Sequence, residues 1–296
     1  MISLPDKGVG AHRVARMLFG AVTFFYWASL YVYVPILPVY AESITGSLSL
    51  VGIVIASYAV PQLLLRIPLG LWFDAVPRRK PLVAASLGMS AAGAVWLAFA
   101  SEAWQLSLAR ATTGVGAAGW VAFTVFFAGY SPSSHGARAI GSINAINQIA
   151  LVVASGTGGV LADAMGYQST FIGAAVLALI GTGILLLTPE PKGDHHFKNE
   201  RPPFRLVASR PLLIAGSGLA VFLQFASFAS VFGFVPVYGA VIGATSGQLG
   251  VITMLALGAA AIAAFLSVRL AERFGYSAAL MVGALILGGS LLLVPA

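Results

Sequence analysis

The 296-residue chain is 59% hydrophobic and only 8% charged. Because soluble domains carry about 25% charged residues, this composition excludes an ordinary water-soluble protein and predicts that lipid surrounds most of the chain. The net charge of +7 does not indicate nucleic-acid binding, since the cations lie in short turns between apolar segments. The sequence contains no cysteine, which excludes disulfides, thiol nucleophiles and thiolate metal sites.

Nine apolar segments are long enough to cross a bilayer as helices, which takes about 20 residues. They cover residues 14–41, 48–72, 81–100, 104–130, 138–162, 168–188, 211–238, 247–268 and 277–296. Their apolar runs are continuous rather than alternating, which favours helices over barrel strands. The first run is longer than the roughly 7–15 apolar residues of a signal peptide, so we interpret it as a span. The sequence therefore predicts an all-α polytopic membrane protein.

The lysines and arginines indicate the orientation of these spans. With the N-terminus inside, 14 of the 16 cations fall on the cytoplasmic side, and the other two, Arg66 and Arg110, lie within spans. The outer loops then carry only Glu42, Glu102 and Asp163. Because cytoplasmic loops are enriched in Lys and Arg, we expect a cytoplasmic N-terminus. The expected location is a bacterial cell (inner) membrane.

A polar segment divides six predicted spans from three. Proline and mixed charge in residues 191–210 predict a cytoplasmic linker between a six-helix bundle (1–190) and a partial second bundle (211–296). A shift of 198 residues aligns Pro38-Val39-Tyr40 with Pro236-Val237-Tyr238, Gly52 with Gly250 and Asp74 with Glu272. This alignment predicts two parallel repeats. Counterparts of the fourth to sixth spans are missing, so we expect an incomplete copy of a twelve-helix protein.

The junction between the second and third spans is the most informative stretch. Gly70 and Asp74 close one apolar segment, and the cations Arg78, Arg79 and Lys80 precede the next. Such a basic turn is typical of a cytoplasmic hairpin, and a glycine lets neighbouring helices approach closely. Glu272 and Arg273 form a weaker second copy of this junction. The pattern alone leaves open a gate or a turn that only sets topology.

Three motifs resemble those of the major facilitator superfamily, and the resemblance covers essentially the whole chain. Gly70, Asp74, Arg78 and Arg79 match the family pattern Gly-x-x-x-Asp-Arg-x-Gly-Arg-Arg/Lys, although Ala75 and Pro77 replace its first Arg and second Gly. Arg110, Gly114 and Gly116 match the fourth-span pattern Arg-x-x-x-Gly-x-Gly. The end of the fifth span, Gly158–Asp163, is also similar, whereas Ser155 stands where family antiporters often carry proline.

This resemblance implies two six-helix bundles and a gate at the Gly70–Lys80 junction. The gate would be formed in the outward-facing state and broken in the inward-facing state. It also implies a carrier of small molecules rather than an enzyme.

Two arginines lie inside predicted spans and need an explanation. A charge at the centre of a membrane helix costs at least about 2.5–3.5 kcal/mol. Arg110 is deep enough to require a partner, a wet cavity or an anionic ligand, although its side chain could also reach the outer surface. Arg66 shares a helical stripe with Tyr58, Gln62 and Gly70. Its side chain could nearly reach the cytoplasmic surface by extending along the helix.

Polar residues on three further spans are candidates for lining a central cavity. The fifth span carries Asn144, Asn147 and Gln148 on one face. Interhelical hydrogen bonding and a substrate-lining role explain such amides equally well. The same two explanations apply to polar residues on the first and seventh spans: Tyr26, Ser29, Tyr33, Gln224, Ser227 and Ser230. Within this group Tyr26 and Gln224 occupy equivalent positions in the two repeats, and so do Ser29 and Ser227.

The leading functional hypothesis is a secondary active transporter of a small organic solute, with import or efflux left open. The alternative is a non-transporting membrane protein or the permease subunit of an ATP-driven complex. The sequence lacks a phosphate-binding loop, a nucleophile elbow and a metalloprotease motif. His195 and His196 have no third ligand nearby in sequence, so no metal or cofactor is expected. We expect a monomer in the lipid bilayer, with a neutral or anionic substrate and a proton or ion as coupling partner.

Overall fold

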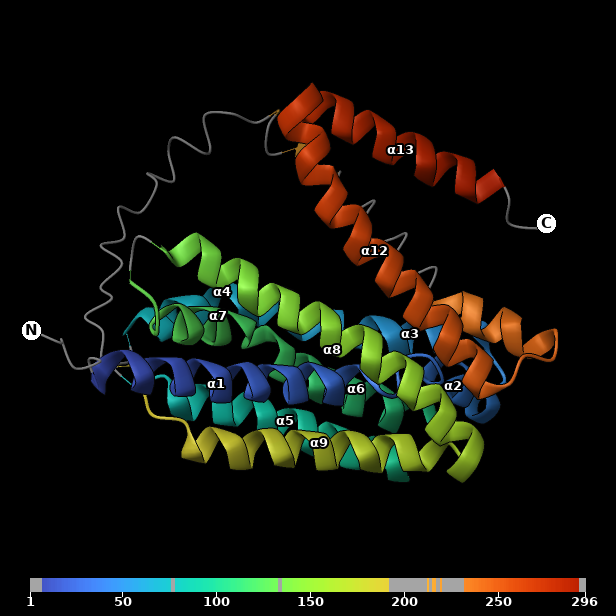
Figure 1. Ribbon diagram of the computed structural model, residues 1–296. Helices are drawn as coiled ribbons and strands as arrows, with labels where there is room; N and C mark the ends of the chain where they lie inside the picture. The colour runs from blue at the N-terminus through green and yellow to red at the C-terminus, as the bar shows by residue number, and fades with distance from the viewer. Residues whose placement is uncertain are drawn as a thin grey trace, which may run out of the picture.

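The computed structural model describes residues 7–75, 78–132, 135–191, 212, 215–216, 219 and 232–292. Within these residues every regular element is a helix (Figure 1). The helices of the first part are α1 (Lys7–Tyr31), α2 (Leu37–Thr45), α3 (Leu48–Ser57), α4 (Ala59–Ala75), α5 (Lys80–Phe99), α6 (Ala103–Ala118), α7 (Trp120–Ala128), α8 (Gly136–Met165) and α9 (Tyr167–Leu187). They are followed by the helix Phe232–Val241, α12 (Ser246–Phe274) and α13 (Tyr276–Leu292).

Seven helical segments of the described chain are long and apolar enough to span a membrane. They correspond to the first six predicted spans and the eighth. Most of the seventh predicted span, 211–238, lies outside the described residues, as does the linker from residue 192 onward. The ninth corresponds to α13, of which 17 residues are described.

Three of the predicted spans are each made of two helices, and the breaks have local causes. A turn at Val32–Ile36, which includes Pro35, separates α1 from α2. Tyr58 separates α3 from α4, where Pro61 lacks the N–H that would bond to the carbonyl of Ser57. Gly119 separates α6 from α7. The breaks at Val32–Ile36 and Gly119 lie mostly in the buried interior of the bundle, where non-helical backbone is shielded from lipid.

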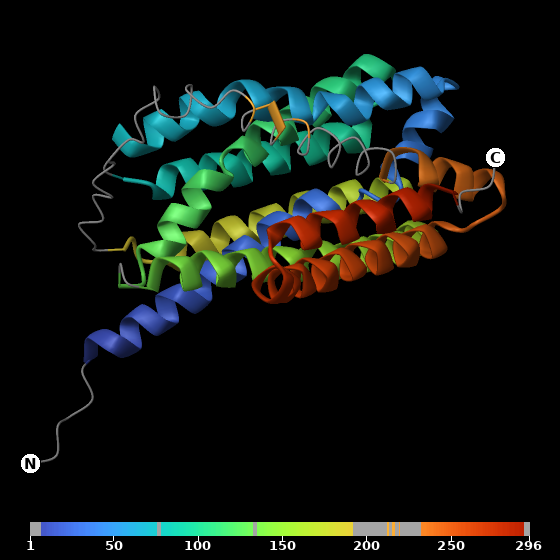
Figure 2. The same ribbon diagram turned by 90° about the horizontal axis from the view of Figure 1, so that it is seen from above.

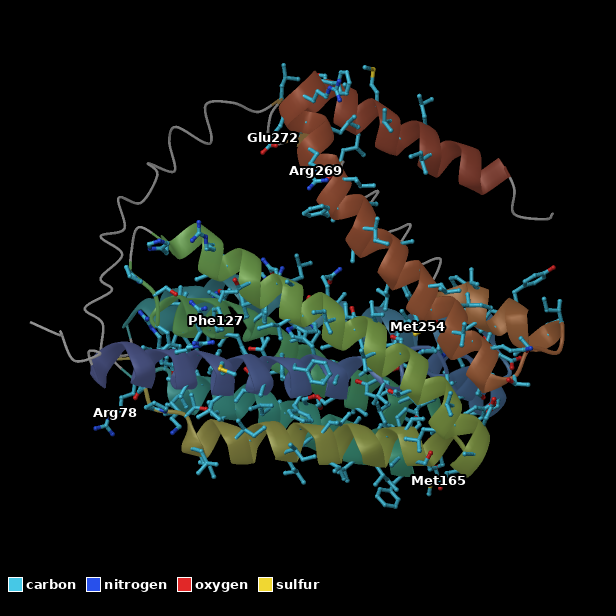
Figure 3. The ribbon with its side chains drawn as sticks, in the orientation of Figure 1. Arg78, Phe127, Met165, Met254, Arg269 and Glu272 are labelled. Atoms are coloured by element: carbon cyan, nitrogen blue, oxygen red, sulfur yellow. The ribbon has the colours of Figure 1, made fainter. Side chains whose placement is uncertain are left out.

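Helices α1 to α9 form one bundle around α1, which contacts α5, α8 and α9, while α6 packs against α3, α4 and α5. Its two ends differ in charge. We call the end that carries Arg16, Arg78–Lys80 and Arg138 the basic end, and the end that carries Glu42, Glu102 and Asp163 the acidic end. Arg78 and Met165 lie at these opposite ends (Figure 3). Large apolar side chains such as Leu63 and Phe99 are exposed on the outside of the bundle, as a lipid-facing surface requires.

The second part of the chain joins the first through a crossing of α12 with α8. At this crossing a Cβ on Gly250 would lie 2.8 Å from the Cα of Gly159, and a Cβ on Gly156 would lie 2.7 Å from the sulfur of Met254. Small residues allow this close approach. Beyond it α12 diverges from α8, so that Arg269 and Glu272 lie away from the bundle (Figure 3). Seen from above, the N-terminal turns of α1 project beyond the bundle (Figure 2).

Candidate functional site

Arg110 lies in the interior of the first bundle. Its side chain is 6% exposed, and its Nη1 donates a hydrogen bond to the hydroxyl of Tyr33 at 3.0 Å. The guanidinium carbon lies 4.4 Å from the ring centroid of Tyr58 and 5.6 Å from that of Tyr33. A cation over an aromatic face is stabilised by about 2 kcal/mol when it is desolvated. The structure thus places the charge inside the bundle, and the side chain does not extend to the outer surface.

The two glycines that follow Arg110 in the motif allow the neighbouring helices to approach α6. A Cβ on Gly114 would overlap the carbonyl oxygen of Tyr58. A Cβ on Gly116 would lie 2.8 Å from the carbonyl oxygen of Ser86 on α5. Gly114 therefore lets the α3–α4 break come close enough for the Tyr58 ring to cover Arg110, four residues earlier on the same helix.

Aromatic side chains surround this region on the α1 side. The ring of Trp27 contacts those of Trp120, Tyr26 and Tyr31, with centroid distances of 5.2, 5.6 and 6.0 Å. Tyr26 stacks on Phe123 at 4.4 Å. Tyr26 was predicted from the sequence as a cavity residue, whereas Trp27, Tyr31 and Trp120 were not. The i, i+4 spacing of Trp27 and Tyr31 was a usable signal, whereas the position of Trp120 depends on the break at Gly119.

Several buried polar groups in this interior have no hydrogen-bond partner within the described chain. They are the hydroxyl of Tyr26, Nε1 of Trp27, Nε of Arg110, Nδ2 of Asn147 and the hydroxyl of Ser155. A buried polar group without a partner costs about 1–3 kcal/mol. Four of the five come from α1, α6 and the middle of α8, and all four can donate a hydrogen bond. Such groups suit a ligand that is rich in acceptor oxygens.

The remaining candidate residues, from the cavity and from the span that carries Arg66, have mixed environments. The hydroxyl of Ser29 contacts that of Ser90 at 2.9 Å, so Ser29 joins α1 to α5. Gln62 on α4 donates to the carbonyl of Tyr58, at the break before that helix, at 3.2 Å. Asn144 and Arg66 are exposed, and Gln148 is half-buried. Gln224, Ser227 and Ser230 lie outside the described residues.

The basic turn of the Gly70–Lys80 junction is held by an acid that the sequence analysis did not identify. Oε1 of Glu190, which follows α9, accepts hydrogen bonds from the backbone N–H groups of Arg79 at 2.6 Å and Lys80 at 3.1 Å. The ammonium of Lys80 donates to the carbonyl of Leu186 at 2.9 Å and to that of Thr188. Because α5 has no side-chain cap of its own, Glu190 supplies acceptors for two of its first amides.

A buried tyrosine supports the same corner. The hydroxyl of Tyr130 donates to the carbonyl of Pro189, directly before Glu190. Burial raises the pKa of Tyr130, and the neighbouring Glu190 carboxylate raises it further. The phenol therefore stays protonated and keeps its role as a donor.

The structure describes only part of the predicted gating residues. Asp74 lies in the last turn of α4, and its side chain is outside the described part of the structure. A Cβ on Gly70 would meet nothing within 4 Å in the described chain. The close helix contact expected at Gly70 is therefore absent among these residues. Glu272 and Arg273 are both exposed near the end of α12.

A second carboxylate–amide contact lies at the acidic end. Oδ2 of Asp163, near the end of α8, accepts a hydrogen bond from the backbone N–H of Gly247 at 2.8 Å. Gly247 is in the first turn of α12, which also has its own capping box. In that box, Thr245 and Gln248 each accept from the other's backbone N–H.

Comparison with known proteins identifies the family. The model of the Major Facilitator Superfamily matches residues 19–296, nearly the whole chain. The chain belongs to the major facilitator superfamily. The fold class and the non-enzyme character predicted from the sequence are thereby confirmed, and the protein is a multi-pass integral membrane protein.

Individual relatives are distant. The inner membrane transport protein YajR of Escherichia coli (strain K12) is 26% identical over 213 residues, which are 70% of this chain and 46% of that protein. A bacterial homologue of the human lysosomal transporter Spinster, in an inward-facing and unoccupied conformation, superposes with a TM-score of 0.76 at 18% identity. The match covers 92% of this chain and 64% of that one. The D-xylose–proton symporter superposes with a TM-score of 0.62 at 15% identity, over 88% of this chain and 69% of that one.

Proposed function

We propose that this protein works as a secondary active transporter that moves a small organic solute across a bacterial inner membrane by alternating access. Family membership supports this proposal, as does the name of the E. coli relative as a transport protein. The observation that carries it is the buried Arg110 against Tyr33 and Tyr58, in a bundle interior that also holds buried donors without partners among the described residues. A static scaffold has no need for a charge at this depth, because it costs several kcal/mol.

The chemistry of this site favours a neutral or anionic substrate rich in hydrogen-bond acceptors. The unpaired groups are donors, and the described carboxylates, such as Asp163 and Glu190, lie at helix ends away from Arg110. A cation would meet Arg110 without a compensating acid there. The aromatic rings of Trp27 and Trp120 suit an apolar or planar part of the same molecule. We further propose a proton or ion as the coupling partner and a monomer as the working unit.

The proposed orientation has the basic end in the cytoplasm. The cations of Arg16, Arg78–Lys80 and Arg138 at one end, against Glu42, Glu102 and Asp163 at the other, support a cytoplasmic N-terminus. The proposed organisation is a first bundle at 1–190, a linker at 191–210 and a second bundle at 211–296. In this orientation the α8–α12 crossing joins the halves near the outer surface. The divergence of α12 from α8 then faces the cell interior, as in an inward-facing carrier (Figure 1).

The direct test is solute flux in reconstituted vesicles, with and without a pH gradient, for the wild type and for Arg110→Gln. We expect Arg110→Gln to lower uptake at least tenfold, because it removes the cation that an acceptor-rich substrate would meet. Arg66→Gln is the matched control, since Arg66 is an exposed arginine within a span, and it should transport normally. Uptake by Arg110→Gln at the wild-type rate would contradict the proposed site. Flux that requires ATP would favour the permease-subunit alternative.

The Gly70–Lys80 junction is the proposed inner gate. We expect Asp74→Asn to lower transport several-fold while the protein still inserts into the membrane, because the variant loses the acid of the proposed gate. Membrane insertion is checked by the amount of folded protein purified from membranes. Unchanged uptake would leave the junction as a turn that only sets topology.

A further inference from the structure

A cavity at the basic end lies apart from the Arg110 site. Its volume is about 340 Å³, within the range of about 300–1,000 Å³ for small-molecule pockets. Residues from three elements line it: α1 supplies Arg16, the segment after α7 supplies Tyr130 and Ser131, and the start of α8 supplies His135, Arg138 and Ser142. Neither the proposed transport cycle nor the gate uses this cavity.

The cavity is basic, and its charges are not neutralised nearby. Arg16 and Arg138 come from different helices, and neither forms an ion pair within the described chain. None of the eight described residues that line the cavity is acidic. The carboxylate of Glu190, a neighbour of Tyr130, does not line the cavity and accepts hydrogen bonds from the backbone N–H groups of Arg79 and Lys80. Two guanidinium groups that share one cavity suit the oxygens of a phosphate group, which bind arginine in bidentate pairs.

The floor of the cavity is ordered by contacts already described. Tyr130 and Ser131 are each 7% exposed. The hydroxyl of Tyr130 donates to Pro189, and the backbone N–H of Ser131 donates to the carbonyl of Ala128 at 2.9 Å. The cavity thus has a buried base beneath two exposed cationic side chains.

The position of the cavity along the bundle matches the level of lipid headgroups. Arg16 lies near the start of the span Arg13–Tyr31, and Arg138 begins the span Arg138–Met165. Tyr130 lies two residues after the span Ala103–Ala128. Exposed apolar residues flank the two arginines, with Met17 next to Arg16 and Ile140 near Arg138. A molecule with its phosphate in the cavity could therefore lay acyl chains along the same surface.

We propose that this cavity binds the phosphate group of an anionic phospholipid from the leaflet at the basic end. Basic pockets between membrane helices on the cytoplasmic side bind anionic headgroups in this way. A soluble phosphate compound shares the same chemistry, but the exposed apolar residues beside the arginines favour the lipid.

The test compares thermal stabilisation of the purified protein in detergent by phosphatidylglycerol, phosphatidylcholine and inorganic phosphate. Phosphatidylglycerol should raise the melting temperature in a saturable way, and phosphatidylcholine should not. The double variant Arg16→Gln/Arg138→Gln should bind phosphatidylglycerol roughly thirtyfold more weakly, from about 1 kcal/mol for each arginine near an anionic surface. The control Arg13→Gln/Arg269→Gln removes the same charge from two exposed arginines that do not line the cavity, and it should bind as the wild type does.

Each other outcome would overturn the proposal. Equal weakening in both double variants would mean that only overall charge attracts the lipid. Equal stabilisation by phosphatidylcholine would mean that the phosphate site has no preference for anionic lipid. Displacement of phosphatidylglycerol by millimolar inorganic phosphate would assign the cavity to a soluble anion. The melting temperatures without added lipid show whether the variants fold.

Discussion

Two carboxylates at opposite ends of the molecule make the same kind of contact with different partners. Glu190 at the basic end accepts from the amides of Arg79 and Lys80 at the start of α5. Asp163 at the acidic end accepts from the amide of Gly247 at the start of α12. An acid at a helix N-terminus is favourable in both places. The first contact stays within the first bundle, and the second connects that bundle to the following part of the chain.

Two adjacent glycines on α8 likewise make one contact within the first bundle and one with the following part of the chain. Gly158 faces the turn that follows α1, where a Cβ would overlap the carbonyl oxygen of Val32. Gly159 faces α12, where a Cβ would lie 2.7 Å from the Cα of Gly250. One helix therefore contributes to a fixed wall on one side and to the contact between the two parts on the other. If the halves rock as proposed, only the second set of contacts must open.

The largest expected effect separates these two glycines. Gly158→Ala should destabilise the first bundle by about 1–3 kcal/mol, the usual cost of overpacking, and should lower the melting temperature. Gly159→Ala should instead push α12 away from α8. Because the chain has no cysteine, spin labels can be attached at Ala164→Cys and Val241→Cys. The distance between the labels should increase in Gly159→Ala only.

A melting temperature that falls equally in both glycine variants, with no change in the label distance, would contradict the distinction between a fixed and an opening face of α8.

The next effect concerns the acid at the basic end. Glu190→Ala should lower the free energy of unfolding by about 1–2 kcal/mol, because the first amides of α5 lose their acceptor. Denaturant unfolding in detergent measures this change. Glu272→Ala is the control, since Glu272 is an exposed acid of the second part, and its effect should be negligible. Equal losses in the two variants would show that Glu190 contributes only net charge.

The smallest effect is expected at the acidic end. Asp163→Asn keeps an acceptor oxygen but loses the charge, which should weaken the contact with Gly247 by about 1 kcal/mol. This loss corresponds to about a fivefold change in the ratio of closed to open arrangements. The same pair of labels at positions 164 and 241 reports that ratio. A change in melting temperature without a change in the ratio would place Asp163 among the residues that only stabilise the fold.

The sequence was sufficient for the fold class because the length of an apolar run and the placement of Lys and Arg are local properties. Arg110 could likewise be predicted to lie inside the bundle, since its depth in a span requires a partner. Its partners could not be derived, because Tyr33 and Tyr58 reach it from other helices. The helix breaks at Tyr58 and Gly119 were missed for a related reason, since the apolar runs continue through them.

The contact of Glu190 at the basic end could not be predicted either, because its partners are distant in the sequence. Glu190 lies 111 residues from Arg79 in the chain, and nothing in the Pro-Glu-Pro sequence around it indicates a helix cap. Small residues were the better signal at the acidic end, because Gly158, Gly159 and Asp163 belong to one motif. The partner helix α12 still could not be assigned from that motif, since it depends on how the two parts of the chain meet.

The capping box at the start of α12 affects how easily the two parts can separate. Thr245 and Gln248 cap the N-terminus of α12 with side chains of the same segment. By contrast, α5 has no such cap, and Glu190 from another part of the chain accepts hydrogen bonds at its start. Loss of the Asp163 contact would therefore leave this capping box in place. The contact between Asp163 and Gly247 can therefore break and form again in each cycle while α12 keeps its first turn.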